Sequence, residues 1–306
     1  MNENMRVSCV IVNYNDAGTV ERLLRLIYGY SVLDSVVVVD NCSSDDSFGC
    51  LSGVADALNG ELERNKIFVL PAGKNGGYGA GNNVGIRYAQ QVLGADYVLI
   101  ANPDVEFSEM LVRRLLRLFS GHPMLGVVSA AMQDPVYGRQ RNGWPLYGFW
   151  RELARCGPVC RRVFRGALEY GERYFRRRRA VYVDAVHGSL LMVDARKMLE
   201  CGGYDEELFL YQEEAVLGCR MRMLGYRTAL LLTDSYLHRH STSISRTYKD
   251  TWERQKLRNE SCMYYYRKYL SANRVQELAA KVFFAVIHLE IWCYERVWMR
   301  IRNKIK

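Results

Sequence analysis

The first stretch of about 120 residues repeats one pattern four times: a short apolar run, a polar turn and a helical segment. The apolar runs occupy four ranges: 7–12, 35–39, 66–70 and 97–101. Helical patterns follow them from Thr19, after Asp46, over 84–93 and over 108–119. Runs that are apolar throughout predict strands buried on both faces, and strands that alternate with helices pair in parallel. We therefore predict an α/β fold with a doubly wound, mostly parallel sheet and helices on both faces.

Beyond this region the regular pattern is interrupted once. Residues 133–180 are rich in Trp, Tyr, Gly and Arg and predict an inserted loop system. A strand-and-helix pattern then returns, with a helix at 195–201 and a strand at 228–232. We predict four parts, of which the first three form one domain over 1–250: a first half at 1–130, an insertion at 133–180, a second half at 181–250 and a helical extension over 251–306.

The net charge of +9 comes from two segments. Residues 151–179 contain ten Arg against three Glu, and residues 251–306 contain 12 Lys and Arg against five Glu. The remainder is mildly acidic, and no zinc-finger, basic-zipper or RNA-recognition motif is present, so we expect no nucleic-acid partner. Both segments mix cations with aromatic residues, which is typical of a peripheral membrane contact. Packing on the protein body, or a homodimer through the C-terminal helices, would bury such residues equally well.

The cysteines and the apolar segments indicate the compartment. Nine cysteines without a zinc-ligand spacing, in a long chain whose N-terminus lacks a signal-peptide layout, predict reduced thiols in a cytoplasmic protein. The longest apolar stretch near the C-terminus, 282–289, is far shorter than the roughly 20 residues that cross a bilayer. We predict no spanning helix and a cytoplasmic location, with the inner face of the cell membrane as the alternative.

Polar side chains follow the ends of the predicted strands, near Asn13, Asp40, Asn75 and Asp104. They are expected to meet, because parallel strands present their carboxyl ends at one edge of a sheet. The segment 74–83 contains four glycines, which allow close backbone approach to a phosphate. Neither the dinucleotide fingerprint nor the phosphate-loop motif fits them, and a tight turn without a ligand remains an alternative.

Three groups of residues could carry chemistry at this edge. Asp104 ends a strand after a proline and could hold a hard cation that bridges a diphosphate, or cap the helix that follows. Glu213 and Glu214 follow an aromatic run and could supply a general base, or complement a helix dipole. His238 and His240 follow an apolar strand, and either could complete a metal site or be a structural histidine.

Six motifs resemble, in the same order, those of the inverting glycosyltransferases of family 2, in particular the bacterial rhamnosyltransferase-like group. They are VSCVIVNYND, VVVVDNCSSDDS, KNGGYGAGNNVGIRYA, VLIANPDV, GSLLMVDARKMLECGGYDEELFLYQEEAVLGCRMRMLGY and YLHRHSTS. The resemblance covers residues 5–245, interrupted over 133–180. It implies a GT-A fold, in which the first half of the domain binds the nucleotide and the second half binds the acceptor.

The resemblance also implies residues that bind the sugar donor. Tyr14 would stack on a pyrimidine base and Asp40 would hydrogen-bond the edge of its ring. The full set of donor-binding candidates is Tyr14, Asn15, Asp40, Asn41, Asn75, Gly76, Asn82 and Asn102.

The metal and base positions depart from the family pattern. The metal-binding D-x-D motif appears here as Asn102-Pro103-Asp104, so Asp104 would hold Mg²⁺ or Mn²⁺ without the first acid, with His238 near the metal and diphosphate. The Glu-Asp pair of the family, whose second acid is the base, appears as Glu213-Glu214. The resemblance therefore implies Glu214 as the base, with Glu213 as the other candidate.

The implied activity moves a sugar from a nucleoside-diphosphate sugar, either dTDP-rhamnose or a UDP-sugar, to a glycan or lipid-linked saccharide in cell-surface polysaccharide synthesis. Glu214 would deprotonate the acceptor hydroxyl as it attacks the anomeric carbon opposite the diphosphate, which inverts that carbon. Such a displacement needs no enzymic nucleophile, and no G-x-S-x-G motif is present. Two alternatives remain: a sugar-phosphate nucleotidyltransferase, which would be expected to carry a basic glycine-rich loop after the first strand, and a catalytically degenerate glycan- or lipid-binding protein.

Overall fold

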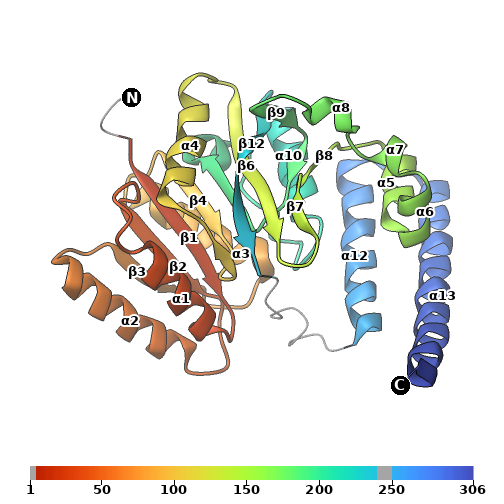
Figure 1. Ribbon diagram of the computed structural model, residues 1–306, viewed down its shortest axis with the longest axis horizontal. Coiled ribbons are helices and arrows are strands. Elements are labelled where there is room, and N and C mark those ends of the chain that lie inside the picture. Colours follow the sequence, from red (N-terminus) through yellow and green to blue (C-terminus); the bar gives the residue numbers. More distant parts are fainter. Residues whose placement is uncertain (1–4, 240–249, 306) are drawn as a thin grey trace. The chain divides into compact units, whose positions relative to one another are not determined.

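The computed structural model describes residues 5–239 and 250–305, and in the last helix it describes the side chains up to Cys293 and that of Arg296. His240 lies outside the described residues. The chain forms two compact units (Figure 1). The sheet unit comprises Met1–Trp144 and Glu172–Ser243, and the helical unit comprises Pro145–Gly171 and Ile244–Lys306.

A mixed sheet forms the sheet unit. Its strands are β1 (Val7–Asn13), β2 (Ser35–Asp40), β3 (Ile67–Pro71), β4 (Tyr97–Ala101), β5 (Val105–Glu106), β6 (Leu125–Asp134), β7 (Gly138–Gln140), β9 (Ala180–Val183), β11 (Leu190–Asp194) and β12 (Arg227–His238). The order is β3-β2-β1-β4-β11-β6-β12-β5, with β7 beside β6 and β9 beside β12. The first four strands run parallel, β11 is antiparallel to β4 and β6, and β12 is parallel to β6. The short strands β8 (Gly143–Trp144) and β10 (Ala185–Val186) pair separately.

Helices cover both faces of this sheet. They are α1 (Ala17–Ile27), α2 (Ser47–Leu62), α3 (Gly77–Gln91), α4 (Glu109–Ser120), α8 (Glu172–Phe175), α9 (Ala195–Glu200) and α10 (Glu213–Met223). Helices α1, α2 and α4 share one buried cluster with Cys9 and Ile11 of β1. Helix α3 packs on the opposite face, where Gly81 and Gly85 lie directly over Val12 and Val10. The predicted α/β fold with helices on both faces is therefore confirmed.

Two predicted boundaries differ from the structure. The helix predicted over 84–93 begins seven residues earlier, at Gly77, so most of the predicted glycine-rich loop is helical. The glycines are needed for packing: a β-carbon built on Gly85 would lie 2.4 Å from Val10 Cγ1, so only glycine lets the helix approach the strand this closely. The strand predicted at 228–232 extends to His238, with an irregularity in its pairing between Leu231 and Ser235.

The helical unit has its own aromatic core. Its helices are α5 (Phe149–Cys156), α6 (Pro158–Val163), α7 (Arg165–Leu168), α12 (Thr251–Tyr269) and α13 (Arg274–Ile305), which confirms the predicted helical region after 251. The ring of Tyr266 packs edge-on against Phe149, with 5.2 Å between ring centroids, and stacks with Phe284 at 6.4 Å. Among the helices described, none is both long enough and apolar enough to cross a membrane.

Candidate active site

The loops after β1 and β2 are joined by a buried hydrogen-bond cluster around Asp40. Its carboxylate accepts hydrogen bonds from the Asn13 amide at 2.8 Å, the Ser43 hydroxyl at 2.6 Å and the Ser43 backbone N–H at 3.0 Å. Asp40 and Asn13 are both buried. A carboxylate offers about four lone-pair directions. Asp40 therefore fixes this loop and retains about one direction for a ligand.

Tyr14 lies between two anchored residues of the same loop. Before it, Asn13 is bonded to Asp40; after it, Asn15 adopts a left-handed backbone, with φ +51°, and its side-chain oxygen accepts a hydrogen bond from the Ser44 N–H at 2.8 Å. The Tyr14 side chain is half-buried. The loop that would present this ring is therefore braced on both sides.

Asn41 connects the end of β2 to the start of α3. Its Nδ2 donates hydrogen bonds to Asn75 Oδ1 and to the Gly77 carbonyl, both at 3.0 Å. Its Oδ1 is buried and has no hydrogen-bond partner in the described structure. A buried acceptor without a partner is unfavourable. Asn41 is therefore a candidate to accept a hydrogen bond from a bound molecule, beside Gly76 at the N-terminus of α3.

The N-terminus of α3 also holds the segment that leads into α10. The Tyr78 N–H donates to the Phe209 carbonyl at 3.1 Å. Gly77 has φ +85°, and a β-carbon built on it would lie 1.9 Å from that carbonyl oxygen. Asn83 bonds both backbone polar atoms of Tyr204, each at 2.9 Å. Residues far apart in the sequence are thus fixed to one helix.

Asp104 and His238 form a close pair at the ends of two neighbouring strands. Val105, directly after Asp104, pairs with His238 across β5 and β12. His238 Nε2 lies 3.3 Å from Asp104 Oδ1, and both side chains are more than nine-tenths buried. The ring of His187 packs edge-on against that of His238, with 5.4 Å between centroids. The structure therefore adds His187 to the two residues predicted near a metal.

A chain of buried hydroxyl groups orients His187. The Ser189 N–H donates to His187 Nδ1 at 3.2 Å, so Nδ1 carries a lone pair and the ring proton lies on Nε2. The Ser189 hydroxyl lies 2.9 Å from the same nitrogen and 2.7 Å from the Tyr236 hydroxyl, which accepts a hydrogen bond from Asn142. Hydrogen bonds that run from the Asn142 amide through Tyr236 and Ser189 to His187 connect these groups, while Asn142 Oδ1 is buried without a hydrogen-bond partner in the described structure. The Ser189 N–H and hydroxyl therefore hold the His187 ring in one orientation.

The Asp104–His238 pair fits a divalent cation. A carboxylate oxygen and an imidazole nitrogen at this separation are suitable ligands for Mn²⁺, and a carboxylate suits Mg²⁺. The described residues contain no cluster of three or more His, Cys, Asp or Glu able to bind a metal. A cation here would therefore take its remaining ligands from a diphosphate and from water.

Glu213 and Glu214 begin α10 and differ in environment. Burial, with a smaller contribution from Glu214, raises the pKa of the Glu213 carboxyl to about 8. Glu213 Oε1 is buried without a hydrogen-bond partner in the described structure. Glu213 therefore carries a proton at neutral pH.

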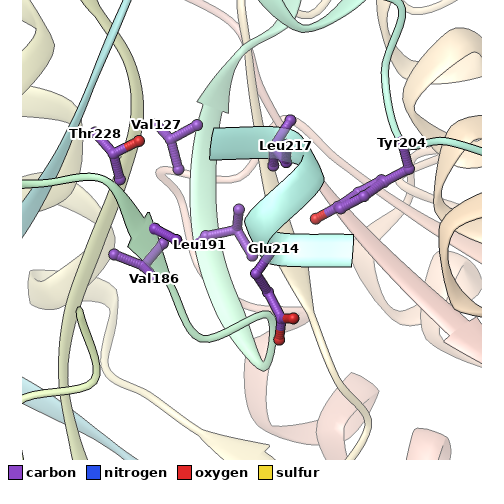
Figure 2. Close-up of a pocket in the computed structure, with 8 residues that line it drawn as sticks. Val127, Val186, Leu191, Tyr204, Glu214, Leu217 and Thr228 are labelled. Atoms are coloured by element: carbon purple, nitrogen blue, oxygen red, sulfur yellow. The ribbon is translucent and has the colours of Figure 1, made fainter. Parts of the chain in front are cut away.

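Glu214 is instead fixed by backbone. Its Oε1 accepts a hydrogen bond from the Gly188 N–H at 3.1 Å, and the Gly188 carbonyl accepts one from the Tyr78 hydroxyl at 2.6 Å. Glu214 borders a small pocket whose other lining residues are mostly apolar: Val127, Ala185, Val186, Tyr204, Leu191, Leu217 and Thr228. Figure 2 shows its side chain leaving the first turn of α10, with the carboxylate directed away from the labelled aliphatic side chains.

The backbone before α10 is strained. Tyr211 and Gln212 have φ values of +73° and +69°, a left-handed conformation that is unfavourable for both residue types. Strain of this kind persists only where surrounding contacts impose it, and it concentrates at functional sites. Here the imposed turn places the two glutamates at the first positions of α10.

The predicted residues fall into two connected groups, and Asn82 and Asn102 have contacts of their own. Asp104, His238, His187, Gly188 and Glu214 form an unbroken series of contacts or chain neighbours. Tyr14, Asn15, Asp40, Asn41, Asn75 and Gly76 lie in the loops described above. Asn82 instead donates to the Tyr78 carbonyl within α3, and Asn102 is tied by its backbone N–H to the Ser189 carbonyl.

Sequence reasoning did not identify His187, Tyr78 or Tyr236. The available signal for His187 was a lone histidine shortly before the apolar residues 190–193.

The sequence also matches known proteins. The sequence profile described as glycosyl transferase family 2 matches residues 8–187. A low-salt glycan biosynthesis hexosyltransferase, Agl10, of Haloferax volcanii is 28% identical over 217 residues, which span 71% of this chain and 61% of that protein. An N-acetylglucosaminyl-diphospho-decaprenol L-rhamnosyltransferase of Mycobacterium tuberculosis is 28% identical over 257 residues, 78% of this chain and 77% of the relative.

Solved structures share the fold. A mannosyltransferase of Pyrobaculum calidifontis, in complex with GDP-Man and Mn²⁺, matches with a TM-score of 0.57 at 14% identity, over 92% of this chain and 70% of its own. GalNAc-T7 with UDP, GalNAc and Mn²⁺ also matches with a TM-score of 0.57, at 13% identity, over 78% of this chain and 45% of its own. These likenesses confirm the GT-A fold. Because the family profile covers more than half of its length, the chain belongs to glycosyl transferase family 2.

Proposed function

We propose that this protein is an inverting glycosyltransferase that moves a sugar from a nucleoside-diphosphate sugar to a saccharide acceptor. The observation that carries the proposal is the contact series that links the Asp104–His238 pair to Glu214 through His187 and Gly188. This series brings the Asp104–His238 pair, which could bind a diphosphate through a cation, near Glu214, which could deprotonate an acceptor hydroxyl. The two glutamates that begin α10 supply the acid–base chemistry.

The donor and acceptor are inferred from the names of relatives. The mycobacterial relative is an L-rhamnosyltransferase that acts on a diphospho-decaprenol lipid, and the Haloferax relative is a hexosyltransferase of glycan biosynthesis. These names support dTDP-rhamnose or a UDP-sugar as donor and a lipid-linked saccharide as acceptor. The product would enter cell-surface polysaccharide synthesis at the cytoplasmic face of the membrane.

Glu214 is the proposed base. The Gly188 N–H holds its carboxylate in one orientation at the first turn of α10. It removes the proton from the acceptor hydroxyl as that oxygen attacks the anomeric carbon. Glu213 retains its own proton at neutral pH and so does not compete for this role. Attack opposite the leaving diphosphate inverts the anomeric configuration.

The loops after β1 and β2 would bind the nucleotide of the sugar donor. Tyr14 stacks on the base, Asp40 uses its remaining lone-pair direction on the ring edge, and Asn41 Oδ1 accepts from the donor. Asn15, Asn75, Gly76, Asn82 and Asn102 complete the proposed donor-binding set. The nucleotide-binding half at 1–130 and the acceptor-side half at 181–250 would meet at the carboxyl ends of the strands.

Asp104 and His238 would hold Mg²⁺ or Mn²⁺. Such an ion, when bound, neutralises the developing charge of a diphosphate leaving group. We expect Asp104→Ala to abolish sugar transfer and to lower the affinity for Mn²⁺, measured by calorimetry with the nucleoside diphosphate present. The exposed Asp56→Ala is the matched control and should change neither quantity. Full turnover by the Asp104→Ala protein would contradict this assignment.

A donor panel tests the activity itself. The purified protein is incubated with dTDP-, UDP- and GDP-sugars, with and without a chelator, and the released nucleotide products are measured. We expect a nucleoside diphosphate to be released from one donor, only with a divalent cation. Release of pyrophosphate would instead indicate a nucleotidyltransferase, and no release with any donor or acceptor would indicate a binding protein.

A further inference from the structure

The two units differ in charge. The helical unit contains 19 Lys and Arg against eight Asp and Glu, whereas the sheet unit contains 23 against 25. The whole positive excess of the protein therefore belongs to the helical unit. The residues of the proposed site belong to the sheet unit.

Helix α13 carries an exposed apolar stripe. Its members are between 45% and 71% exposed: Val275, Leu278, Val282, Val286, Leu289 and Trp292. At about 100° per residue, these positions occupy one face about 120° wide. Ala280, Phe284 and Ile287 lie on the opposite face and are buried. The α13 stripe is therefore the outward face of a helix whose other side already packs in the helical unit.

Cations border the α13 stripe. Arg274 and Lys281 are exposed and lie along one edge of it, at helical positions next to Leu278 and Trp292. Arg296 places its guanidinium over the Trp292 ring, 4.4 Å from the centroid. A tryptophan paired with a cation at the edge of an apolar face suits the boundary between lipid headgroups and acyl chains.

Residues 158–165, which comprise α6 and the first residue of α7, repeat this composition within the same unit. Val159, Val163 and Phe164 are more than half exposed. Arg161, Arg162 and Arg165 are interspersed with them and are exposed as well. Arg161 and Arg165 share the carboxylate of Glu169. One acid for three cations leaves this element positively charged.

We propose that the helical unit binds the surface of an anionic lipid bilayer, with the α13 stripe in the interface and the surrounding cations on the headgroups. The charge argues against a second copy as the occupant, because two copies of the same unit would bring two cationic surfaces together. Apolar contact and attraction to anionic lipid act together in such binding. The proposal deepens the proposed function, since a lipid-linked acceptor would lie at the same surface, but the binding itself does not require catalysis.

Vesicle sedimentation tests the proposal with the full chain. Vesicles of phosphatidylcholine with about 30 mol% phosphatidylglycerol are compared with vesicles of phosphatidylcholine alone. We expect at least tenfold stronger binding to the anionic vesicles, and a loss of most of that difference at high salt. Equal binding to both compositions, or binding to neither, would overturn the proposal.

A charge-matched pair of variants locates the surface. Leu278→Glu with Val282→Glu alters the α13 stripe, while Val136→Glu with Met223→Glu adds the same charge at exposed apolar positions of the sheet unit. We expect the first double variant to bind anionic vesicles at least tenfold more weakly and the second to bind like the parent, with thermal melting unchanged in both. Equal losses in both variants would contradict the assignment.

Sedimentation velocity and a soluble acceptor separate the remaining explanations. A parent protein that dimerises, and that Leu278→Glu with Val282→Glu converts to a monomer without weakening vesicle binding, would show that a second copy covers the stripe. Transfer to a water-soluble acceptor should survive the stripe substitutions. If the parent binds vesicles but transfers no sugar, the proposed function fails while the surface assignment stands.

Discussion

The loops after β1 and β2, around Asp40, and the start of α10, at Glu213 and Glu214, use polar groups in opposite ways. Around Asp40, buried polar atoms satisfy one another, with three hydrogen bonds on one carboxylate. Around Glu213, a buried carboxyl keeps an oxygen without a partner in the described structure and has a raised pKa. Paired polar groups stabilise and stiffen a loop, whereas an unpaired buried acid lowers stability and persists where chemistry requires it. Variants around Asp40 and variants at the start of α10 should therefore differ in their effects on stability and on activity.

The largest effect is expected for Glu214→Gln. The amide oxygen can still accept the Gly188 N–H, so the fold should be retained, but the variant cannot take a proton from the acceptor. We expect kcat to fall by about a thousandfold, which lies within the usual range for loss of a general base. The exposed Glu61→Gln is the control and should keep full activity with the same melting temperature. Equal activity in the two proteins would remove Glu214 from the mechanism.

Gly77→Ala should destabilise the contact between the start of α3 and the segment that leads into α10. The added carbon would meet the Phe209 carbonyl and also occupy a left-handed backbone conformation. We expect the free energy of unfolding to fall by about 3 kcal/mol or more, the sum of backbone strain and overpacking. Gly73→Ala separates the two causes, because Gly73 has φ +78° with no atom within 4 Å of the built carbon, and should cost about 1 kcal/mol. Equal losses in urea unfolding would show that the close contact contributes nothing.

Asp40→Ala should act on stability and on donor binding together. It leaves the buried Asn13 amide and the Ser43 groups without their acceptor, which costs about 2 kcal/mol. Because the loop that carries Tyr14 also loses its brace, nucleotide affinity should fall as well. Urea unfolding and calorimetry with a nucleoside diphosphate measure the two effects. A stable variant with normal nucleotide affinity would contradict the role of Asp40 in fixing the loop that carries Tyr14.

Glu213→Gln should change the pH dependence of stability. The native pKa of Glu213, about 8, lies above its unfolded value of about 4.5, so the native state binds more protons between these pH values. Stability should therefore decline as pH rises through this window, by at most about 1.4 kcal/mol per pH unit, and level off above it. The glutamine variant should show a flatter profile than the parent. Parallel unfolding profiles from pH 5 to pH 8 would show that Glu213 is ionised in the native protein.

The sheet could be predicted because its strands carry local signals. Val7–Asn13 is mostly apolar and Tyr97–Ala101 almost entirely so, and turn residues follow both, so length and composition sufficed. The start of α3 could not be predicted in the same way. Its glycines lower helix propensity, and only the close approach of Gly85 to Val10 shows that packing requires them.

The candidate site was predictable where a residue ends a strand. Asp104 follows the end of β4 and His238 ends β12, and the structure puts them in contact. His187 carries no comparable local signal, because its environment is assembled from β12, Ser189 and Asn142. Glu213 and Glu214 are adjacent in the sequence and differ only through burial and Gly188, which are properties of the tertiary structure.

The attachment of residues 204–209 to α3 has a consequence for engineering. The Phe209 carbonyl lies against Gly77 and accepts a hydrogen bond from the Tyr78 N–H. Asn83 bonds both backbone polar atoms of Tyr204. A chimera that replaces residues 181–250, the proposed acceptor-side half, with those of a relative would lose these contacts. We expect the chimera to fold only if the incoming segment places a carbonyl group where that of Phe209 lies, against Gly77. Otherwise residues 77–83 would have to be exchanged with it. Exchange of residues 181–250, the proposed acceptor-side half, is thus constrained by the contacts of residues 77–83 of α3.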